Sequence, residues 1–297
     1  MFFSECRRGL KVNQYRIFDE RGRRGGGADE RDVFGAVGLP FIEPVLRENR
    51  GELEAAAAGE LPKLVRLEQI RGDLHMHTKA TDGRSSLAEM VEAAAALGYE
   101  YIAITDHSPA LAMTRGLDRA RLAEQGRSIR ALNDELGGRL HVLRGIEVDI
   151  LPDGTLDLPL EVLRDLDWVV ASVHSKLDLG RAEQTRRIVR ALESAVVDCL
   201  GHPTGRLIGE REPYEIDLEE ILAAARRVGA AVEINAFPDR LDLCDTHARR
   251  AKELGVPIVI STDSHATTHL HNLSFGVDTA RRGWLERADV ANTLPFE

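Results

Sequence analysis

Cysteine is scarce in this chain of 297 residues, which has only Cys6, Cys199 and Cys244 and no CxxC pair. This spacing excludes a disulfide framework and fits a reducing compartment. A run of about 18 apolar residues is also missing, which argues against a transmembrane helix. The opening residues MFFSECRRGL carry charge early and have no long apolar stretch, so they do not resemble a signal peptide. We therefore expect a cytoplasmic protein without a membrane partner.

An excess of positive charge is absent as well. Lys and Arg number 39 against 49 Asp and Glu, which gives a formal net charge of −10. Bulk attraction to phosphates cannot hold such a chain on nucleic acid, so any action on nucleic acid must depend on a local site. Divalent cations bound there would supply positive charge that the composition does not count.

The amino-terminal part differs in pattern from the rest of the chain. Residues 21–32, RGRRGGGADERD, predict a Gly-rich and charged loop, and an Ala-rich stretch follows at 55–58. We expect small helices and turns over residues 1–65, without a core of their own. The main domain is expected over residues 66–297.

From Ile70 onward, apolar strand-like runs alternate with amphipathic helical runs. Strands are expected at 70–76, 101–106, 140–148, 168–173, 196–200, 231–235 and 257–262. Helices are expected at 86–97, 118–136, 181–194, 217–228 and 245–254, and several start at a capping residue and end at a glycine. Repeated strand-then-helix units indicate a parallel α/β sheet, and about 230 residues favour a closed or nearly closed barrel.

Residues that can bind metal stand at or near the ends of these strands. They are His75, His77, His107, Glu147, His174, His202, Asp263 and His265. In a parallel barrel the carboxyl ends of the strands meet on one face, where the ligands would converge. Each motif alone could arise by chance, but the whole set predicts a metal centre, because imidazole and carboxylate together suit Zn²⁺, Mn²⁺ or Fe²⁺. His141, His247, His269 and His271 are expected to be structural or surface residues.

The motifs that carry these residues resemble the PHP (polymerase and histidinol phosphatase) superfamily in type and order. They are HMH at 75–77, TDH at 105–107, GIE at 145–147, SVHS at 172–175, GHP at 201–203 and TDSH at 262–265. The resemblance implies a distorted, TIM-like (β/α)₇ barrel with up to three divalent ions, Mn²⁺ or Zn²⁺, with Fe²⁺ as a further candidate.

The resemblance also implies how the ligands are shared between the ions. One ion would be bound by His75, His77, Glu147 and Asp263. A second would share Glu147 and add His174 and His202, and a third would be bound by Asp82, His107 and His265. Glu147, Asp263 and His174 are expected to carry catalysis.

Longer segments resemble the carboxyl-terminal half of bacterial family-X DNA polymerases. They are GLKVNQYRIF at 9–18, VGLPFIEPVLRENRGELEAA at 37–56, LEQIRGDLHMHTKATDG at 67–83, SVHSKL at 172–177 and GHPTGRLIGEREPYEID at 201–217. The resemblance implies that residues 1–65 are a remnant of the polymerase thumb with a linker. It also implies a Mn²⁺-dependent 3′→5′ exonuclease that acts on DNA 3′ ends in repair, with 3′-end phosphoesterase or abasic-site cleavage as related activities. The palm aspartates of that family would precede residue 1, so no polymerase activity is expected.

Other polar residues beside these motifs are candidates for substrate binding. Lys176, Arg206 and Arg240 could position phosphates or could be ordinary surface charges. Asn235 could hydrogen-bond the substrate or stand in a turn. Asp106 could orient a ligand histidine or cap a helix.

Two other functions fit the same residues. One is a phosphatase that acts on a small phosphomonoester such as histidinol phosphate or a nucleotide. The other is a non-catalytic, metal-binding scaffold, although every ligand position is occupied by a residue that can bind metal, which argues against lost activity.

Overall fold

The computed structural model describes residues 11–12, 17–18, 21–22 and 24–296. The chain divides into two compact units, Met1–Lys63 and Leu64–Glu297. In the described part of the chain, no helix is long and apolar enough to cross a membrane.

The first unit contains strands as well as helices. Three short antiparallel strands are β1 (Lys11–Val12), β2 (Ile17–Phe18) and β3 (Arg24–Gly26). They precede α2 (Glu30–Ala36), the 3₁₀ helix η1 (Pro44–Leu46) and α3 (Glu52–Ala58). The loop expected over 21–32 is therefore wrong in part, because it includes β3 and the first turn of α2. Backbone pairing needs no side chain, so glycines can form a strand edge.

The first unit also buries apolar side chains, contrary to the expectation from its sequence. Phe34 and Leu46 are buried, and the rings of Phe34 and Phe41 pack edge to face at 5.6 Å. The guanidinium of Arg47 lies over both rings and makes an ion pair with Glu30. A small cluster thus holds α2 against the segment that follows it.

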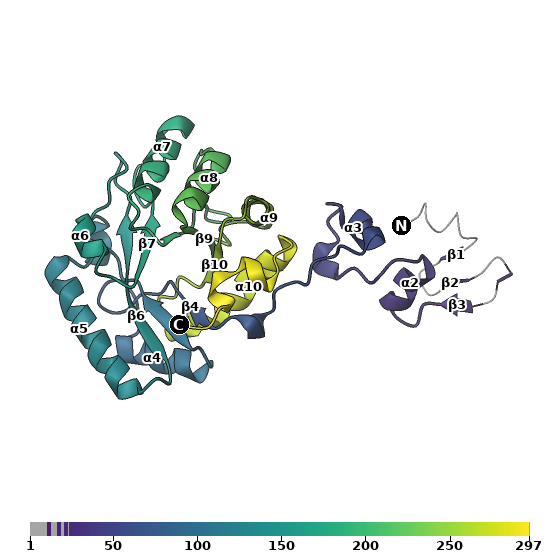
Figure 1. Cartoon of the computed structure of the whole chain (residues 1–297), viewed down its shortest axis with the longest axis horizontal. Coiled ribbons are helices and arrows are strands. Elements are labelled where there is room, and N and C mark those ends of the chain that lie inside the picture. Colours follow the sequence, from purple (N-terminus) through teal and green to yellow (C-terminus); the bar gives the residue numbers. More distant parts are fainter. Residues whose placement is uncertain (1–10, 13–16, 19–20, 23, 297) are drawn as a thin grey trace. The chain divides into compact units, whose positions relative to one another are not determined.

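The second unit is a barrel of parallel strands with helices outside (Figure 1). The strands are β4 (Gly72–Asp73), β5 (Tyr101–Ile104), β6 (His141–Asp149), β7 (Trp168–Ser172), β8 (Cys199–Leu200), β9 (Ala231–Asn235) and β10 (Ile258–Ser261). They pair in sequence order, each parallel to the next. Their residues are almost all buried, as expected for parallel strands covered on both faces. The predicted (β/α)₇ fold is confirmed.

Contacts between the first and last strands close the barrel. Met76 pairs with Ser264 in a parallel bridge, and the backbone nitrogen of His77 donates to Ser264 O at 2.8 Å. At the other end, the buried side chain of Asn292 donates to Gly72 O and Ile260 O, both at 2.8 Å. Asn292 therefore joins β4 to β10 where their backbones do not pair.

Five helices lie where they were expected, and the described part of this unit has two more, α6 and α10. They are α4 (Leu87–Ala96), α5 (Arg119–Leu136), α6 (Leu160–Leu163), α7 (Arg181–Leu192), α8 (Leu218–Val228), α9 (Asp245–Leu254) and α10 (Leu273–Arg282). Short 3₁₀ helices are η2 (Leu67–Gln69), η3 (Ala112–Thr114), η4 (Thr267–Asn272), η5 (Arg287–Asp289) and η6 (Ala291–Thr293). The sequence was expected to form a loop around His269 and His271, but η4 runs into α10 there, without a side-chain cap to mark the start.

The end of the first unit gives a testable boundary, since Leu64 and Val65 belong to the barrel. Both are buried, Val65 N donates to Leu285 O at 2.9 Å, and Leu64 bridges to Glu286. A chain that begins at Leu64 is expected to unfold at the same urea concentration as the barrel of the full chain. A chain that begins at Arg66 lacks the buried side chains of Leu64 and Val65. Its free energy of unfolding is expected to be lower by at least about 3 kcal/mol. Fluorescence of Trp168 and Trp284 would follow the transition, and equal midpoints for the two truncations would contradict this boundary.

Candidate metal centre

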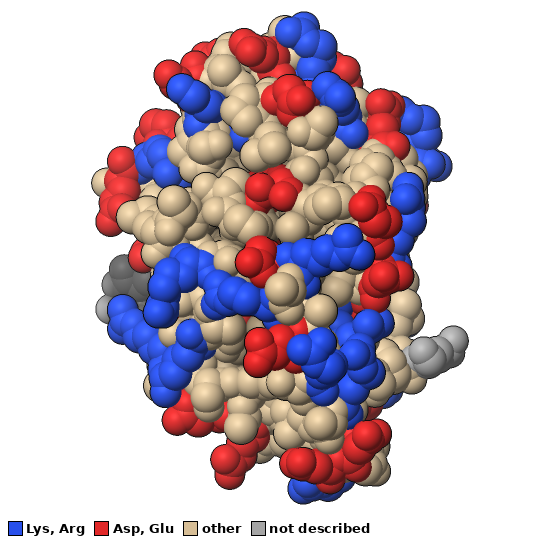
Figure 2. Space-filling model, turned by 90° about the vertical axis from the view of Figure 1, so that its left-hand side faces the viewer, with Lys and Arg blue, Asp and Glu red and all other residues tan. Residues whose placement is uncertain are grey.

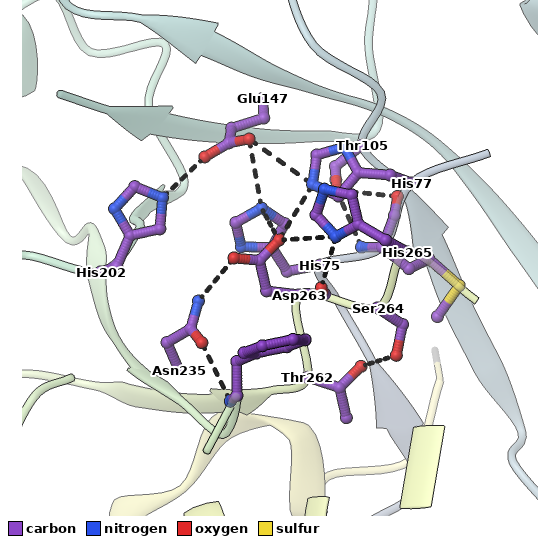
Figure 3. Close-up of polar contacts among 12 residues, drawn as sticks. His75, His77, Thr105, Glu147, His202, Asn235, Thr262, Asp263, Ser264 and His265 are labelled. Atoms are coloured by element: carbon purple, nitrogen blue, oxygen red, sulfur yellow. Dashed lines mark hydrogen bonds and ion pairs between the residues drawn. The ribbon is translucent and has the colours of Figure 1, made fainter. Parts of the chain in front are cut away.

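The predicted ligands converge on one site at the carboxyl ends of the strands. Figure 3 shows His75, His77, Glu147, His202, Asp263 and His265 pointing toward one another. Most of them follow the last residue of a strand, whereas Glu147 lies within β6. Short distances link His75, His77, Asp82, His107, Glu147, His174, His202, Asp263 and His265 into one network. The structure thus brings together every residue that the sequence suggested as a ligand.

Glu147 lies at the centre of this network and directs its two oxygens at different imidazoles. Its Oε2 is 3.5 Å from Nε2 of both His75 and His77. Its Oε1 is 3.3 Å from Nε2 of His174 and 3.0 Å from Nε2 of His202. A carboxylate in this position can bridge two cations, one on each side.

Asp263 completes the group on the Oε2 side. Its Oδ1 is 3.1 Å from Nε2 of His77 and 3.7 Å from Nε2 of His75. Two donors that each lie about 2.1 Å from one tetrahedral ion are about 3.4 Å apart, so this spacing suits a single ion. Asp263 has a φ of 52°, a left-handed conformation that is uncommon outside glycine and that concentrates at functional sites.

Asp82 forms a further group with three imidazoles. Its Oδ2 is 3.4 Å from Nε2 of His107 and 3.5 Å from Nε2 of His265. The ring of His77 stacks on both, with centroid distances of 4.4 Å to His107 and 4.2 Å to His265. His77 therefore faces this group as well as the Asp263 group, and the four residues could hold one ion.

Several nitrogen and oxygen atoms that can bind a metal are buried in the site and make no hydrogen bond among the described residues. They are Nε2 of His75, both ring nitrogens of His77, Nδ1 of His107 and Oε2 of Glu147. Some of these atoms are close to an oppositely charged group, as His107 Nδ1 is to Glu147 Oε2 at 2.9 Å, but these contacts do not have hydrogen-bond geometry. Protein interiors rarely leave buried polar atoms unpaired, and here they gather in one place. Nitrogen and carboxylate donors of this kind fit a divalent transition-metal ion.

Local electrostatics keep key ligands in forms that bind cations. Burial opposes ionisation of Glu147 and Asp263, but nearby imidazoles, His75 among them, hold the pKa of both carboxyl groups well below their usual range. Burial, together with the charges of His265 and His107, lowers the pKa of His77 to about 3. The two carboxylates are therefore anionic and His77 is neutral.

Two further carboxylates support the ligands and were missed from the sequence. Glu233 in β9 accepts from Nδ1 of His75 at 2.8 Å and from the backbone nitrogen of His202 at 2.7 Å. Asp149 in β6 lies 3.1 Å from Nδ1 of His174. The sequence signal for these supporting residues was a charged residue inside an otherwise apolar, buried strand. Asp149 lies two residues after Glu147, which is the period of a strand, so both side chains point to the same face.

Asp106 has neither of the roles suggested for it. It accepts hydrogen bonds from Thr78 N at 2.8 Å, Thr78 Oγ1 at 2.7 Å, Thr81 Oγ1 at 2.5 Å and Gln125 Nε2 at 2.6 Å. It contacts no ligand histidine and caps no helix in the described part of the chain. Instead it fixes the loop that leads to Asp82.

The residues suggested for substrate binding have different surroundings. Arg240 Nε lies 3.5 Å from Asp263 Oδ2, at the edge of the site. Asn235 is buried and donates to Asp263 Oδ2 at 3.1 Å, so its amide orients a ligand. Arg206 donates to the backbone oxygens of Arg240 and Leu241, which ties up much of its guanidinium. Lys176 is exposed.

Glu233 offers a test of this support. Replacing Glu233 by Gln removes the charge that faces His75 but keeps the shape, and metal affinity is expected to fall about 10–100-fold, as for other supporting residues. Competitive titration with a chromogenic chelator would measure the affinity. Glu219→Gln is a matched control, because Glu219 makes a surface ion pair with Arg250. Equal affinities of the two variants would rule out the orienting role.

Two family comparisons match successive parts of the chain. Residues 73–237 match the PHP domain, and residues 6–48 match the DNA polymerase beta thumb. The PHP match contains all the ligands except Asp263 and His265.

Individual relatives extend these matches. The DNA polymerase/3′-5′ exonuclease PolX of Bacillus subtilis (strain 168) is 43% identical over 286 residues, which are 96% of this chain and 50% of that protein. This chain thus spans about half the length of that relative. A protein named "Probable phosphatase" from Thermoanaerobacter sp. (strain X514) is 30% identical over 74% of this chain and 89% of its own length. The crystal structure of histidinol phosphate phosphatase from Lactococcus lactis subsp. lactis Il1403, with zinc, L-histidinol and phosphate, has a TM-score of 0.50 at 22% identity. It covers 71% of this chain and 93% of that chain, and the likeness supports the shared fold.

Proposed function

Because the chain belongs to the PHP domain family, we propose that it is a metal-dependent phosphoesterase that removes nucleotides from DNA 3′ ends as a 3′→5′ exonuclease. The position of Glu147 between two groups of imidazoles carries the phosphoesterase part. The 43% sequence identity to the DNA polymerase/3′-5′ exonuclease PolX extends over both units of the chain, and it supports DNA as the substrate. Residues 1–63 are proposed to be a remnant of a polymerase thumb with a linker, which the thumb match over residues 6–48 supports.

The chain's own residues would hold the centre and orient the substrate. Divalent cations bound there, Mn²⁺ or Zn²⁺ in number up to three, would activate water and neutralise phosphate charge. Glu147 and Asp263 hold their oxygens toward the imidazoles, with Asp263 fixed by Asn235. Arg240 lies beside Asp263 and could contact a phosphate oxygen. The water oxygen would add to phosphorus as the bond to the 3′ oxygen breaks.

The exposure of the ligands indicates where the substrate enters. The side chains of His75, His77 and Glu147 are closed off, at 0%, 0% and 1% exposed. Those of Asp82 and His265 are 31% and 27% exposed. A phosphoester would therefore approach from the side of Asp82 and His265.

One face of the barrel carries positive charge despite the acidic composition. Figure 2 shows Lys and Arg gathered in a band on the side where Figure 1 places α5 and α6. Arg119, Arg127 and Arg130 line a groove between these helices, which Glu161 and Asp165 also line. Among the described residues, none of the three arginines has an acidic partner within 4 Å. Such a band suits the phosphates of a DNA backbone.

A direct assay distinguishes DNA from a small phosphomonoester as the substrate. The second substrate is the one that the 30% identical relative named "Probable phosphatase" supports. The Mn²⁺-loaded chain is incubated with a 5′-labelled oligonucleotide and, separately, with histidinol phosphate. We expect a ladder of products shortened from the 3′ end. Phosphate release from histidinol phosphate with intact DNA would favour the phosphatase.

A charge-reversal variant sharpens this assay. Arg127→Glu combined with Arg130→Glu should slow DNA shortening at low salt and leave p-nitrophenyl phosphate hydrolysis unchanged, because both side chains are exposed and remote in sequence from the ligands. Arg226→Glu with Arg227→Glu, on α8, is the matched control.

A further inference from the structure

The segment after β9 holds an aromatic ring next to the metal centre. Phe237 follows Asn235, the last residue of β9, by two positions. Its backbone nitrogen donates to Asn235 Oδ1 at 3.0 Å, and the amide of the same Asn235 donates to Asp263 Oδ2 at 3.1 Å. Phe237 O accepts from the backbone nitrogens of Arg240 and Leu241 at 2.8 and 3.0 Å. The position of Phe237 is therefore fixed relative to the ligand Asp263.

A second ring joins Phe237 from another segment. His269, in η4, accepts at Nδ1 from the backbone nitrogen of His265 at 3.3 Å. Its ring centroid is 5.2 Å from that of Phe237, and the two planes meet at 75°. Both residues are partly exposed. Together they form an aromatic corner, Phe237 with His269, that is tied by hydrogen bonds to Asp263 on one side and His265 on the other.

The aromatic corner lies at the accessible side of the metal centre. His265 is one of the two most accessible ligands, so the corner borders the open side of the centre. Arg240, on the same turn as Phe237, adds a cation beside Asp263. In the described part of the chain, no ligand side chain and no supporting carboxylate makes a hydrogen bond to either ring, and the single link is from the backbone nitrogen of His265 to His269. A partly exposed ring beside a phosphate site suits a ligand that carries a flat, apolar group next to its phosphate.

We propose that Phe237 and His269 form the subsite for the nucleobase of the nucleotide that is removed, with the base stacked on the corner. This inference rests on the proposed function and specifies the substrate class as nucleoside-bearing phosphoesters. Stacking tolerates any base, because every base has a π face, so the subsite would not select sequence. Phe237 is then a specificity-determining residue.

Two chromogenic diesters isolate the contribution of the base. The p-nitrophenyl ester of thymidine 5′-phosphate and methyl p-nitrophenyl phosphate share the bond that breaks, from phosphorus to nitrophenolate, but only the first carries a base. With the Mn²⁺-loaded full chain, Phe237→Ala is expected to raise KM for the thymidine ester about five- to tenfold, at the low end of measured base stacking because the ring is only partly exposed. KM for the methyl ester should not change, and Phe237→Trp should restore the wild-type KM.

Controls separate this subsite from general damage. Phe296→Ala is the matched variant, since Phe296 stacks on His141 at the start of β6, at the opposite end of the barrel. An equal rise in KM for both esters in Phe237→Ala, or no rise for either, would overturn the subsite.

Direct binding gives a second readout that holds if the chain cleaves only monoesters and the exonuclease function fails. The probe is the 5′-phosphonate analogue of 2-aminopurine deoxynucleoside 5′-monophosphate, in which carbon replaces the ester oxygen so that a monoesterase cannot cleave it. Its fluorescence falls when its base stacks. We expect quenching with the wild-type chain and a Kd about fivefold or more weaker with Phe237→Ala. Equal quenching and Kd with both chains would reject the corner as a base site, whatever the substrate of the enzyme.

Discussion

Replacing Glu147 by alanine is expected to lower kcat on DNA and on p-nitrophenyl phosphate alike, by at least on the order of 10³-fold. Among the described residues, Glu147 is the side chain that lies between both groups of imidazoles, because its Oε2 faces His75 and His77 while its Oε1 faces His174 and His202. Losing it would separate the two groups and leave their imidazoles without the central negative charge. Initial rates at saturating metal, with ion content measured by elemental analysis, would test this.

Matched variants make the result interpretable. Glu219→Ala removes an exposed carboxylate on α8 that lies outside the centre and outside the arginine-lined groove, and it should keep wild-type rates. Circular dichroism should show that Glu147→Ala keeps the barrel, because the strands are held by apolar packing on both sides of Glu147. Full activity of Glu147→Ala at unchanged ion content would exclude this residue from the centre. Wild-type chain that binds ions but hydrolyses neither substrate would favour the scaffold hypothesis.

Most of the ligands could be predicted from the sequence because the topology of the barrel alone brings the strand ends together. In a parallel barrel every strand ends on the same face, so His107 and His202 must approach each other although 95 positions separate them in sequence. Recognising strand ends therefore suffices for every ligand except Asp82, which lies in a loop after β4 and was predicted from the family resemblance. Small errors in the strand bounds do not change this result. Strand β4 shows this, since only Gly72–Asp73 is regular strand, yet His75 and His77 still reach the centre.

The supporting residues could not be foreseen in the same way. Glu233 contacts His75 across 158 positions, and its local sequence AVEIN contains no recognisable motif. Asp106 was noticed, but its partners Thr78 and Gln125 come from two different segments. Such pairings depend on how the barrel closes and on side-chain reach, which sequence periodicity does not encode. The same holds for α10, whose start merges with η4 and so lacks a capping signal.

Stripping the metal is expected to abolish hydrolysis and to lower the thermal midpoint of the barrel. Grouped donors at about three to four per ion predict about two to three ions per chain purified without chelator. An ion present at 100 times its Kd stabilises the folded state by about 2.7 kcal/mol, which corresponds to roughly 5–10 °C for a domain of this size. Scanning calorimetry of the chelator-treated and Mn²⁺-restored chain would measure the shift.

The size of that shift follows from what the centre contains. Glu147, Asp263 and the supporting Glu233 are buried together, and burying carboxylates is costly unless positive charge faces them. In the ion-free chain that charge must come from protonated imidazoles, which burial disfavours, whereas bound cations supply it directly. Restoring Mn²⁺ should recover both the midpoint and hydrolysis, and Mg²⁺ should do so less well because imidazole-rich sites favour transition metals. Less than one ion per chain under metal-replete conditions, or a midpoint that chelator leaves unchanged, would show that the convergent histidines are structural.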